Sequence, residues 1–227
     1  MATCLPIAAA HDRNAHMREN RALVHRPEVP RAVTREALLD ATERMLGKLG
    51  YAQLTVEAIG EEAGLARRTV YLYFRGKQEA VLGTIDRIVE RVARRLTELA
   101  ELPKPAPERL FDMLVARVMV RFDSVRDYHH ALDGVFAALR PDVLARREAY
   151  FATEAGLLAT VLRQGQRAGE VTTGNALKTA DLLLLCTNAL LPHGLSLTDL
   201  TDRPQTERRA QAAATLLLDG LCVRTAS

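Results

Sequence analysis

The stretch that decides the fold is residues 55–77, which read TVEAIGEEAGLARRTVYLYFRGK. Thr55 is a suitable N-cap for a short helix whose inner face includes Ile59. Gly64 interrupts this helical pattern, and glycine adopts the positive φ of a tight turn without steric cost. A second helical pattern starts near Ala66. Two short helices joined by a turn of three or four residues that contains a glycine predict a helix-turn-helix.

The second helix of this pair carries side chains that suit the reading of bases. In a helix-turn-helix the second helix lies in the major groove of DNA, with its N-terminal residues at the base edges. Arg67 and Arg68 head the helix, and an arginine donates two hydrogen bonds to O6 and N7 of guanine. Thr69 is placed to contact a base edge, a thymine methyl group or a phosphate. Val70 falls on the opposite face and should pack inward against Ile59.

Other polar side chains of the stretch suit the DNA backbone. Tyr71 and Tyr73 carry hydroxyl groups, and Lys77 opens the next helix with an ammonium group. Such groups contact phosphates, which position a protein on DNA without specifying sequence. Thr55 is expected to bring a backbone phosphate to the N-terminus of its helix.

Residues 34–88 resemble the DNA-binding segment of the TetR family of bacterial transcription regulators. Residues 37–50 match its first helix, residues 55–64 its second, and residues 69–77 its recognition helix with the start of the fourth. The resemblance implies that the contacts to DNA come from seven side chains: Thr55, Arg67, Arg68, Thr69, Tyr71, Tyr73 and Lys77.

One residue departs from the family pattern. The family usually has alanine after the buried isoleucine of the second helix, whereas this chain has Gly60. A glycine fits a close crossing of two helices, but it lowers helix propensity by about 1 kcal/mol relative to alanine.

The composition predicts an all-α fold. The chain has 227 residues, of which 48% are hydrophobic, and it contains no tryptophan. Alanine and leucine dominate, which favours helix, and we find no alternating strand pattern. The net charge of +3 excludes a polybasic nucleic-acid coat, although a local basic surface is enough for a DNA reader.

The pattern divides the chain into four parts. Residues 1–31 show no periodicity and are expected to form a disordered basic arm, which either follows phosphates or is simply a solvated tail. Residues 32–78 form the predicted helix-turn-helix domain, and residues 79–102 a connecting helix. The proline-rich segment after it opens a helical domain over residues 103–227, to which the resemblance assigns ligand binding and dimerisation.

Hydrophobic periodicity predicts the individual helices. The first begins at Thr34, with an apolar stripe that includes Met45 and Leu49. In the larger domain we expect a helix around residues 110–122, a short helix over 128–139 that Pro141 stops, and a long helix over 142–168. Asn175 is expected to cap a helix that reaches residue 191, and the last helix covers residues 206–223. The last two helices are apolar on more than one face, which predicts a partner, and in the family they pair with their copies in a dimer.

Most aromatic residues of the larger domain are candidates for lining a pocket. An apolar pocket with a few polar groups is typical of a site for a small organic ligand. The alternative is an ordinary core with polar residues at its edge. The candidate residues are Phe111, Phe122, Tyr128, Phe136, Tyr150, Phe151 and Asn188, with His193 beside them.

The sequence offers little for other chemistry. Cys4, Cys186 and Cys222 are far apart, so neither a disulfide framework nor a zinc site follows, and we expect a reduced cytoplasm. Cys186 is expected to be a buried, inert thiol, with a redox switch as the alternative. His129 and His130 are adjacent and point about 100° apart on a helix, which makes a poor chelate. We find no catalytic motif, phosphate loop or membrane span, and we expect no cofactor or metal.

These observations predict a homodimeric DNA-binding regulator that reads a near-palindromic operator. The resemblance implies a repressor that a small, largely apolar effector releases, and activation is the alternative. Two rival classes are an enzyme built on the helical domain and a helix-turn-helix that makes only protein contacts. We expect a ligand to push the far end of the connecting helix, near Leu102, and so to move the recognition helices.

Overall fold

The computed structural model describes residues 31–222 of the chain. The predicted arm up to residue 30, with Cys4, lies outside the described residues. Nine α-helices and three short 3-10 helices make up this part, which contains no β-strand, so the all-α fold is confirmed. The α-helices are α1 Arg31–Gln53, α2 Val56–Glu62, α3 Arg67–Tyr71, α4 Lys77–Ala100, α5 Ala106–Val125, α6 Leu132–Ala168, α7 Ala176–Thr187, α8 Leu197–Thr201 and α9 Arg203–Asp219. The 3-10 helices are η1 Arg126–Ala131, η2 Asn188–Leu190 and η3 Pro192–Gly194.

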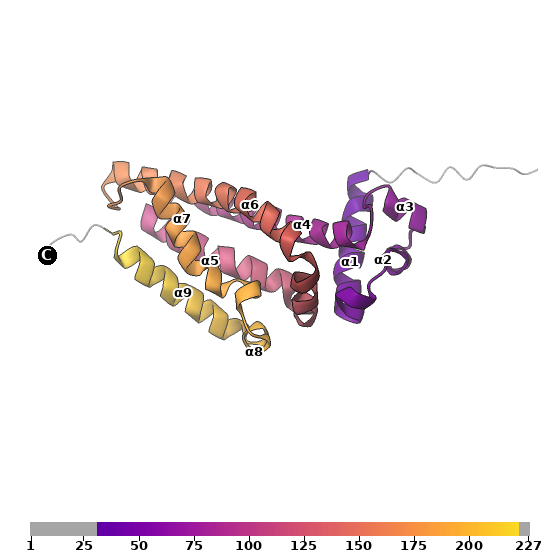
Figure 1. Cartoon of the computed structure of the whole chain (residues 1–227). Helices are drawn as coiled ribbons and strands as arrows, with labels where there is room; N and C mark the ends of the chain where they lie inside the picture. The colour runs from indigo at the N-terminus through magenta and orange to yellow at the C-terminus, as the bar shows by residue number, and fades with distance from the viewer. Residues whose placement is uncertain (1–30, 223–227) are drawn as a thin grey trace, which may run out of the picture.

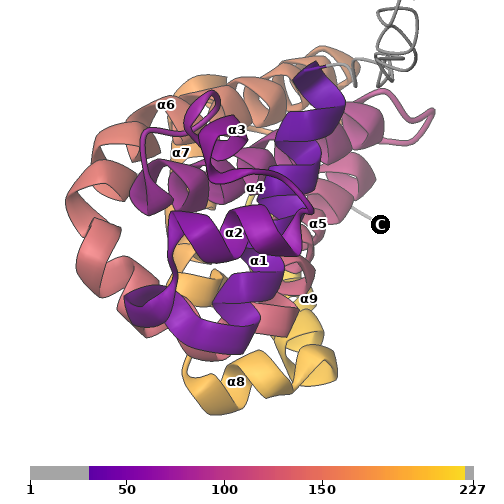
Figure 2. The same cartoon turned by 90° about the vertical axis from the view of Figure 1, so that its right-hand side faces the viewer.

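The molecule has a small head and an elongated body. Helices α1–α3 form the head at one end, and α4 leads from the head into the body, which α5–α9 complete (Figure 1). Viewed from the head end, α2 and α3 lie in front of α1 (Figure 2). None of the helices in the described range combines the length and the apolarity that crossing a membrane requires.

The head closes around a core that the helix-turn-helix pattern predicts. Leu54, Ile59 and Val70 are fully buried in one cluster, so Val70 does face inward as expected. The buried face of α1 differs from the prediction, because Leu46 is fully buried while Leu49 is 37% exposed. The reason is that α1 packs on three sides, against α2, α4 and η1, so its buried face is set by all three neighbours.

Gly60 lies where α2 closely approaches the turn and α3. A β-carbon at this position would lie 2.9 Å from the carbonyl oxygen of Leu65 and 3.2 Å from Cγ2 of Val70. The turn carries Gly64 at φ 67°, as its glycine predicts. In this chain glycine at position 60 therefore lets α3 approach α2.

The prediction that Pro141 ends a helix is wrong. Residues 126–131 form η1, and α6 then runs without a break from Leu132 to Ala168 with Pro141 inside it. A proline removes one backbone hydrogen bond and costs helix stability. The helix continues because residues on both sides of the proline are anchored in the core, among them Leu139 and Leu158.

In the last part of the chain the predicted helix cap at Asn175 is correct, whereas the predicted helix lengths are not. The Asn175 side chain accepts hydrogen bonds from the backbone N–H groups of Leu177 and Lys178, as expected. Helix α7 stops at Thr187, and the short helix α8, with its capping box at Ser196, was not predicted. Cys186 is exposed, so the expectation of a buried thiol is wrong.

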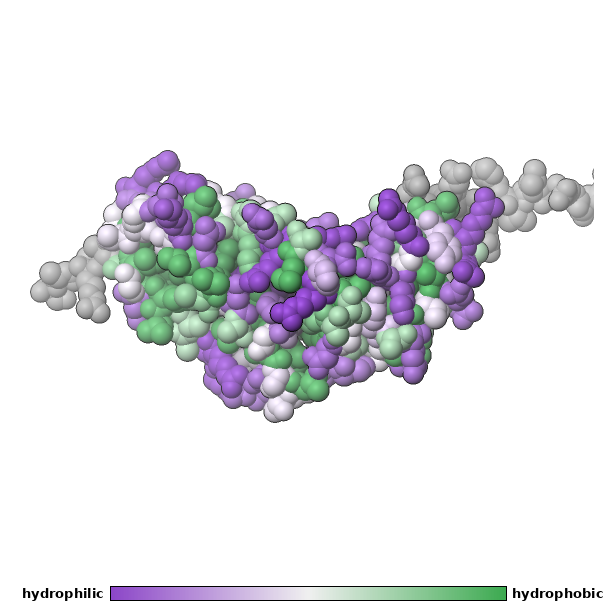
Figure 3. Space-filling view, viewed as in Figure 1, coloured by the Kyte–Doolittle hydropathy of each residue, from purple (hydrophilic) through white to green (hydrophobic). Residues whose placement is uncertain are grey.

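An apolar surface covers the outer faces of α7 and α9. Leu182, Leu185 and Leu216 are 59%, 60% and 77% exposed. Figure 3 shows hydrophobic surface over these helices, at the end of the body away from the head. Cys186 lies beside Leu185 on the exposed side of α7.

Candidate DNA interface and ligand cavity

The recognition helix α3 presents its two arginines to solvent, but they differ in their partners. The Arg67 guanidinium pairs with Glu57 at 2.7 Å between Nε and Oε1. It also donates a hydrogen bond to the Tyr71 hydroxyl at 3.2 Å and lies 5.4 Å from the centre of that ring. Arg68 is exposed and has neither an ion pair nor a hydrogen bond with any residue between 31 and 222. Of the two predicted base readers, Arg68 is therefore the one whose donors are available.

The predicted phosphate contacts surround α3. Thr55 is exposed and caps α2, because its side-chain oxygen accepts a hydrogen bond from the N–H of Ala58 at 3.1 Å. Tyr71 is 44% exposed, while Thr69 and Tyr73 are half-buried. These side chains come from the start of α2, from α3 and from the residues after it, and all belong to the head.

Lys77, which we predicted to contact a phosphate, also makes hydrogen bonds inside the protein. Its ammonium group donates hydrogen bonds to the carbonyl oxygens of Tyr51 and Ala52, at 3.1 and 3.2 Å, and lies 4.9 Å from the centre of the Tyr51 ring. The lysine thus ties the end of α1 to the start of α4. Two of its three hydrogen-bond donors are used inside the protein.

The body contains a cavity of about 440 Å³ next to the head. Its wall comes from α4, α5, η1, α6 and the segment at η3, and also includes Leu46 of α1. Of the predicted pocket residues, four line this cavity together with His193: Tyr128, Phe136, Tyr150 and Phe151.

Three predicted pocket residues lie elsewhere. Phe111, near the start of α5, packs against a separate core cluster that residues of α4, α5, α6, α7 and α9 form. Phe122 is buried in the core but does not line the cavity. The Asn188 side-chain oxygen accepts a hydrogen bond from the Arg117 guanidinium at 2.7 Å. Aromatic character alone therefore does not separate cavity residues from core residues.

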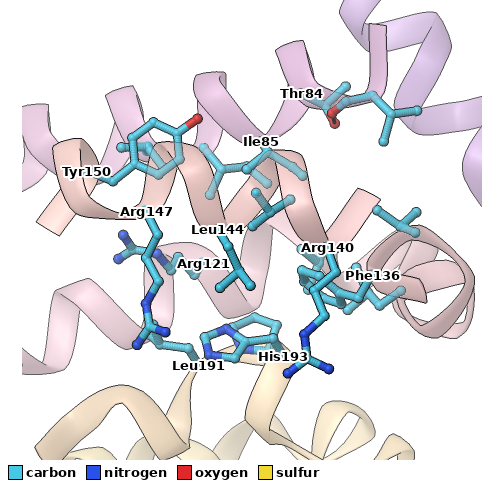
Figure 4. Close-up of a pocket in the computed structure, with 18 of the residues that line it drawn as sticks. Thr84, Ile85, Arg121, Phe136, Arg140, Leu144, Arg147, Tyr150, Leu191 and His193 are labelled. Carbon is cyan, nitrogen blue, oxygen red and sulfur yellow. Dashed lines mark hydrogen bonds between the residues drawn. The ribbon is translucent and has the colours of Figure 1, made fainter. Parts of the chain in front are cut away.

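Three arginines on the cavity wall were missed by the sequence analysis: Arg121, Arg140 and Arg147. Figure 4 shows the guanidinium groups of Arg140 and Arg147 on either side of His193, with Leu144 between their side chains. A signal was present in the sequence. Arg140, Leu144, Arg147 and Phe151 recur every three or four residues, so they share one face of α6.

A buried ion cluster lies behind this wall. Glu154 accepts hydrogen bonds from Arg117, at 2.6 Å, and from Arg121. Arg117 is fully buried and also donates to the Thr187 hydroxyl at 2.9 Å. Burial lowers the pKa of the Arg117 guanidinium to about 10, so it is charged at neutral pH. Two arginines share one carboxylate, which leaves a net positive charge beside the cavity.

The charge of the cluster acts on His193. The pKa of its imidazole is lowered from 6.5, first by burial and then by the charges of Arg147, Arg121 and Arg117. The ring packs edge to face on Phe136, with 6.1 Å between centroids. His193 is therefore neutral at neutral pH.

The adjacent histidines make structural contacts. The His129 ring is hydrogen-bonded to the carbonyl oxygen of Arg126 at 2.7 Å, and the His130 ring to that of Gly47 at 3.0 Å. Within the described residues no group of three or more histidine, cysteine, aspartate or glutamate side chains could hold a metal ion.

Comparisons with known proteins agree with this arrangement. Residues 38–82, which span the helix-turn-helix, match the family described as "Bacterial regulatory proteins, tetR family". Over this segment the chain is similar to the TetR family. Over 67 residues it is 34% identical to the HTH-type transcriptional regulator EthR of Mycobacterium tuberculosis, and this match covers 30% of the chain and 31% of EthR. The chain thus spans less than a third of the length of that curated relative.

Two further matches extend beyond the head. The "Fatty acid metabolism regulator protein" of Bacillus subtilis is 24% identical over 153 residues, which cover 66% of this chain and 77% of that protein. The solved "SmeT-Triclosan complex", whose protein is the SmeT repressor of Stenotrophomonas maltophilia, matches with a TM-score of 0.61 at 20% identity. It covers 84% of this chain and 92% of SmeT, and the likeness is one of fold.

Charge holds the head and α4 together. Arg87 of α4 is buried and reaches three acids of α1: Glu36 at 3.1 Å, Asp40 at 2.6 Å and Glu43 at 2.8 Å. An arginine with three carboxylate partners resists separation of the two helices, because its buried charge would lose them. Helices α1 and α4 should therefore move together.

The cavity lies at the head end of α4. It contacts α4 between Val81 and Val89, so the expected push on the far end, near Leu102, is wrong. The cavity also touches Leu46 of α1 directly and Tyr128 of η1, which packs on α1. A bound molecule would therefore act within one or two side chains of the head.

Proposed function

We propose that the protein is a sequence-specific DNA-binding transcription regulator. The observation that carries this proposal is α3, a short helix on a helix-turn-helix head with Arg68 exposed and its donors free for a base edge. The match of residues 38–82 to the TetR family supports it. The homologous EthR is named as a transcriptional regulator of the same helix-turn-helix type.

The regulator acts as a homodimer on a near-palindromic site. Leu182, Leu185 and Leu216 form an apolar surface on α7 and α9 that a monomer would leave in water. Pairing these helices with their copies buries that surface and sets two heads side by side. Each α3 then reads one half-site, and the half-sites lie about 34–36 Å apart, one turn of DNA.

A small molecule in the cavity releases the DNA. The cavity lies between α6 and η3 on one side and α4 with Leu46 on the other. Because Arg87 joins α4 to α1, a ligand that changes the distance between α6 and α4 moves the whole head. Rotation of both heads changes the spacing of the two α3 helices. The solved structure of SmeT contains triclosan, which supports a small organic effector for this fold.

The test is selection of bound fragments from a pool of random DNA duplexes, followed by footprinting. We expect one near-palindromic sequence to be enriched and protected. Gel shifts at two salt concentrations, with and without non-specific competitor DNA, should show binding that weakens with salt but survives the competitor. Enrichment of no sequence, or loss of all binding to competitor, would contradict the proposal and favour a helix-turn-helix that contacts protein.

A further inference from the structure

The cavity wall carries more positive than negative charge. Among the described residues that line it, three are arginines and one is acidic, the exposed Asp133. Arg121 already pairs with Glu154. Arg140 and Arg147 form no ion pair with any residue of the described range.

Two buried or half-buried acids near this wall, Asp86 and Glu154, are already paired with other residues, and Asp133 on the wall is exposed to solvent. Asp86 of α4 pairs with Arg146 at 2.5 Å and accepts a hydrogen bond from the Tyr150 hydroxyl. Glu154 is buried and serves both Arg117 and Arg121. The charges of Arg140 and Arg147 are therefore not balanced from inside the protein.

The two unbalanced arginines lie at one wall of a largely apolar space. They flank His193, and Leu144 lies between them (Figure 4). Val81, Ile85 and Ile88 line the cavity from α4, and Phe136 from α6. An arginine beside an apolar surface binds an oxyanion with charge-assisted hydrogen bonds, which are stronger than neutral ones. Arg140 is exposed, and Arg147 is half-buried and lies 4.9 Å from the centre of the Phe151 ring, so both guanidinium groups keep N–H donors that an anion in the cavity can use.

We propose that the cavity binds an amphipathic anion, an apolar chain that ends in a carboxylate or phosphate ester, with the anionic group between Arg140 and Arg147. The inference rests on the proposed function, since it assigns a chemical class to the effector of the regulator. It also changes the sequence-based expectation of a largely apolar effector by adding a charged head group. The chain of the ligand lies against α4, and so against the helix that Arg87 ties to the head.

The test uses four probes with the same dodecyl chain below their micellar concentrations: dodecanoate, dodecyl phosphate, dodecanol and dodecyltrimethylammonium. Binding to the full chain is measured by calorimetry. We expect at least one anion to bind about tenfold or more tightly than dodecanol, and the cation to bind weakest. The stronger of the two anions identifies the head group. Equal affinities for the anions and dodecanol, or no binding of either anion, would overturn the inference.

Two variants locate the head group. Arg140→Gln and Arg147→Gln should each weaken the preferred anion about tenfold while leaving the affinity for dodecanol unchanged. Arg163→Gln is the matched control, because Arg163 is also on α6, is exposed and does not line the cavity. If both cavity variants bind the anion as the control does, the assignment is wrong. Circular dichroism confirms that each variant folds.

The same variants separate this inference from the proposed function. Arg140 and Arg147 lie in the body, so their replacement should leave DNA affinity without ligand unchanged. A chain that binds DNA but does not prefer anions is a regulator with another effector. If the protein prefers anions through these arginines but enriches no DNA sequence, the proposed ligand class stands and the proposed regulatory function is contradicted.

Discussion

The carbonyl oxygen of Asp127 lies 2.8 Å from the position that a β-carbon on Gly47 would occupy. Because Gly47 has no side chain, α1 of the head and η1 of the body pack closely at this point. The His130 ring is hydrogen-bonded to the carbonyl oxygen of Gly47. Tyr128 of η1 lines the cavity one residue further along. The contact therefore joins the cavity to the head.

Gly47→Ala should force α1 and η1 apart. We expect a loss of roughly 1–3 kcal/mol in the free energy of unfolding, because the new methyl group meets backbone rather than a flexible side chain. Chemical denaturation measures the change. Gly156→Ala is the control, since nothing lies within 4 Å of its β-carbon position and alanine favours helix. A Gly47→Ala protein as stable as the control would show that the two elements separate easily.

Arg68→Ala should relax the preference at one position of the operator. We expect a cost of about 1–3 kcal/mol in specific binding, because Arg68 has its donors free for a base edge. Arg67→Ala should change specificity less, since Arg67 is engaged with Glu57 and Tyr71. Fluorescence anisotropy with a set of single-base operator variants measures both. The assignment is reversed if only Arg67→Ala alters the ranking of the operators.

Lys77→Ala should weaken binding to all operator sequences alike. The lysine also holds the carbonyl groups of Tyr51 and Ala52, so we expect the melting temperature to fall as well. The same operator set and thermal unfolding measure the two effects. A change in base preference at one operator position would contradict this prediction.

Leu185→Glu and Leu216→Glu should each weaken the dimer. A carboxylate in a paired apolar surface must lose its hydration without gaining a partner. Light scattering at low micromolar concentration should give twice the 25.0 kDa chain mass for the unchanged protein and a lower mass for both variants. Val33→Glu, in the exposed start of α1, should keep the dimer mass. A monomeric unchanged chain would contradict the palindromic site as well.

Glu154→Gln should destabilise the body strongly. It removes the carboxylate that Arg117 and Arg121 share and leaves two buried cations facing each other. Breaking a buried ion pair from one side costs roughly 3–5 kcal/mol. Glu148→Gln, an exposed position on the same helix, is the control for removing a charge. Urea unfolding of the two variants compares them, and equal midpoints would show that the cluster contributes nothing.

Acidification should lower the free energy of unfolding, because protonation of His193 is less favourable in the folded protein. Its pKa in the folded protein lies below 6.5, so the unfolded chain binds the proton more readily, and the folded state loses stability as pH falls below 6.5. The charged groups that face it come from α5 and α6: Arg117, Arg121, Arg140, Arg147 and Asp133. In His193→Gln this part of the pH dependence should disappear. Thermal unfolding of both proteins between pH 5 and 7.5 measures it, and parallel curves would contradict the prediction.

Much of the head, and the start of α7 in the body, could be predicted from the sequence because the signals are local. Gly64 has the positive φ that its turn requires, Asn175 caps its helix, and α4 starts at Lys77 and ends before the prolines. Each of these depends on residues within one or two turns of the chain. The repeat of apolar residues also placed Val70 correctly in the core.

What only the tertiary structure decided depends on residues far apart in sequence. Helix α6 continues through Pro141 because core contacts hold both of its sides, and Cys186 is exposed because the neighbours of α7 cover its other face. Arg67 and Arg68 were equal candidates for reading a base by residue type. The pairing of Arg67 with Glu57, and that of Lys77 with the end of α1, appear only when the helices pack. The cavity gathers one face of α6, the first half of α4 and Leu46, and no local pattern states which helix faces will meet.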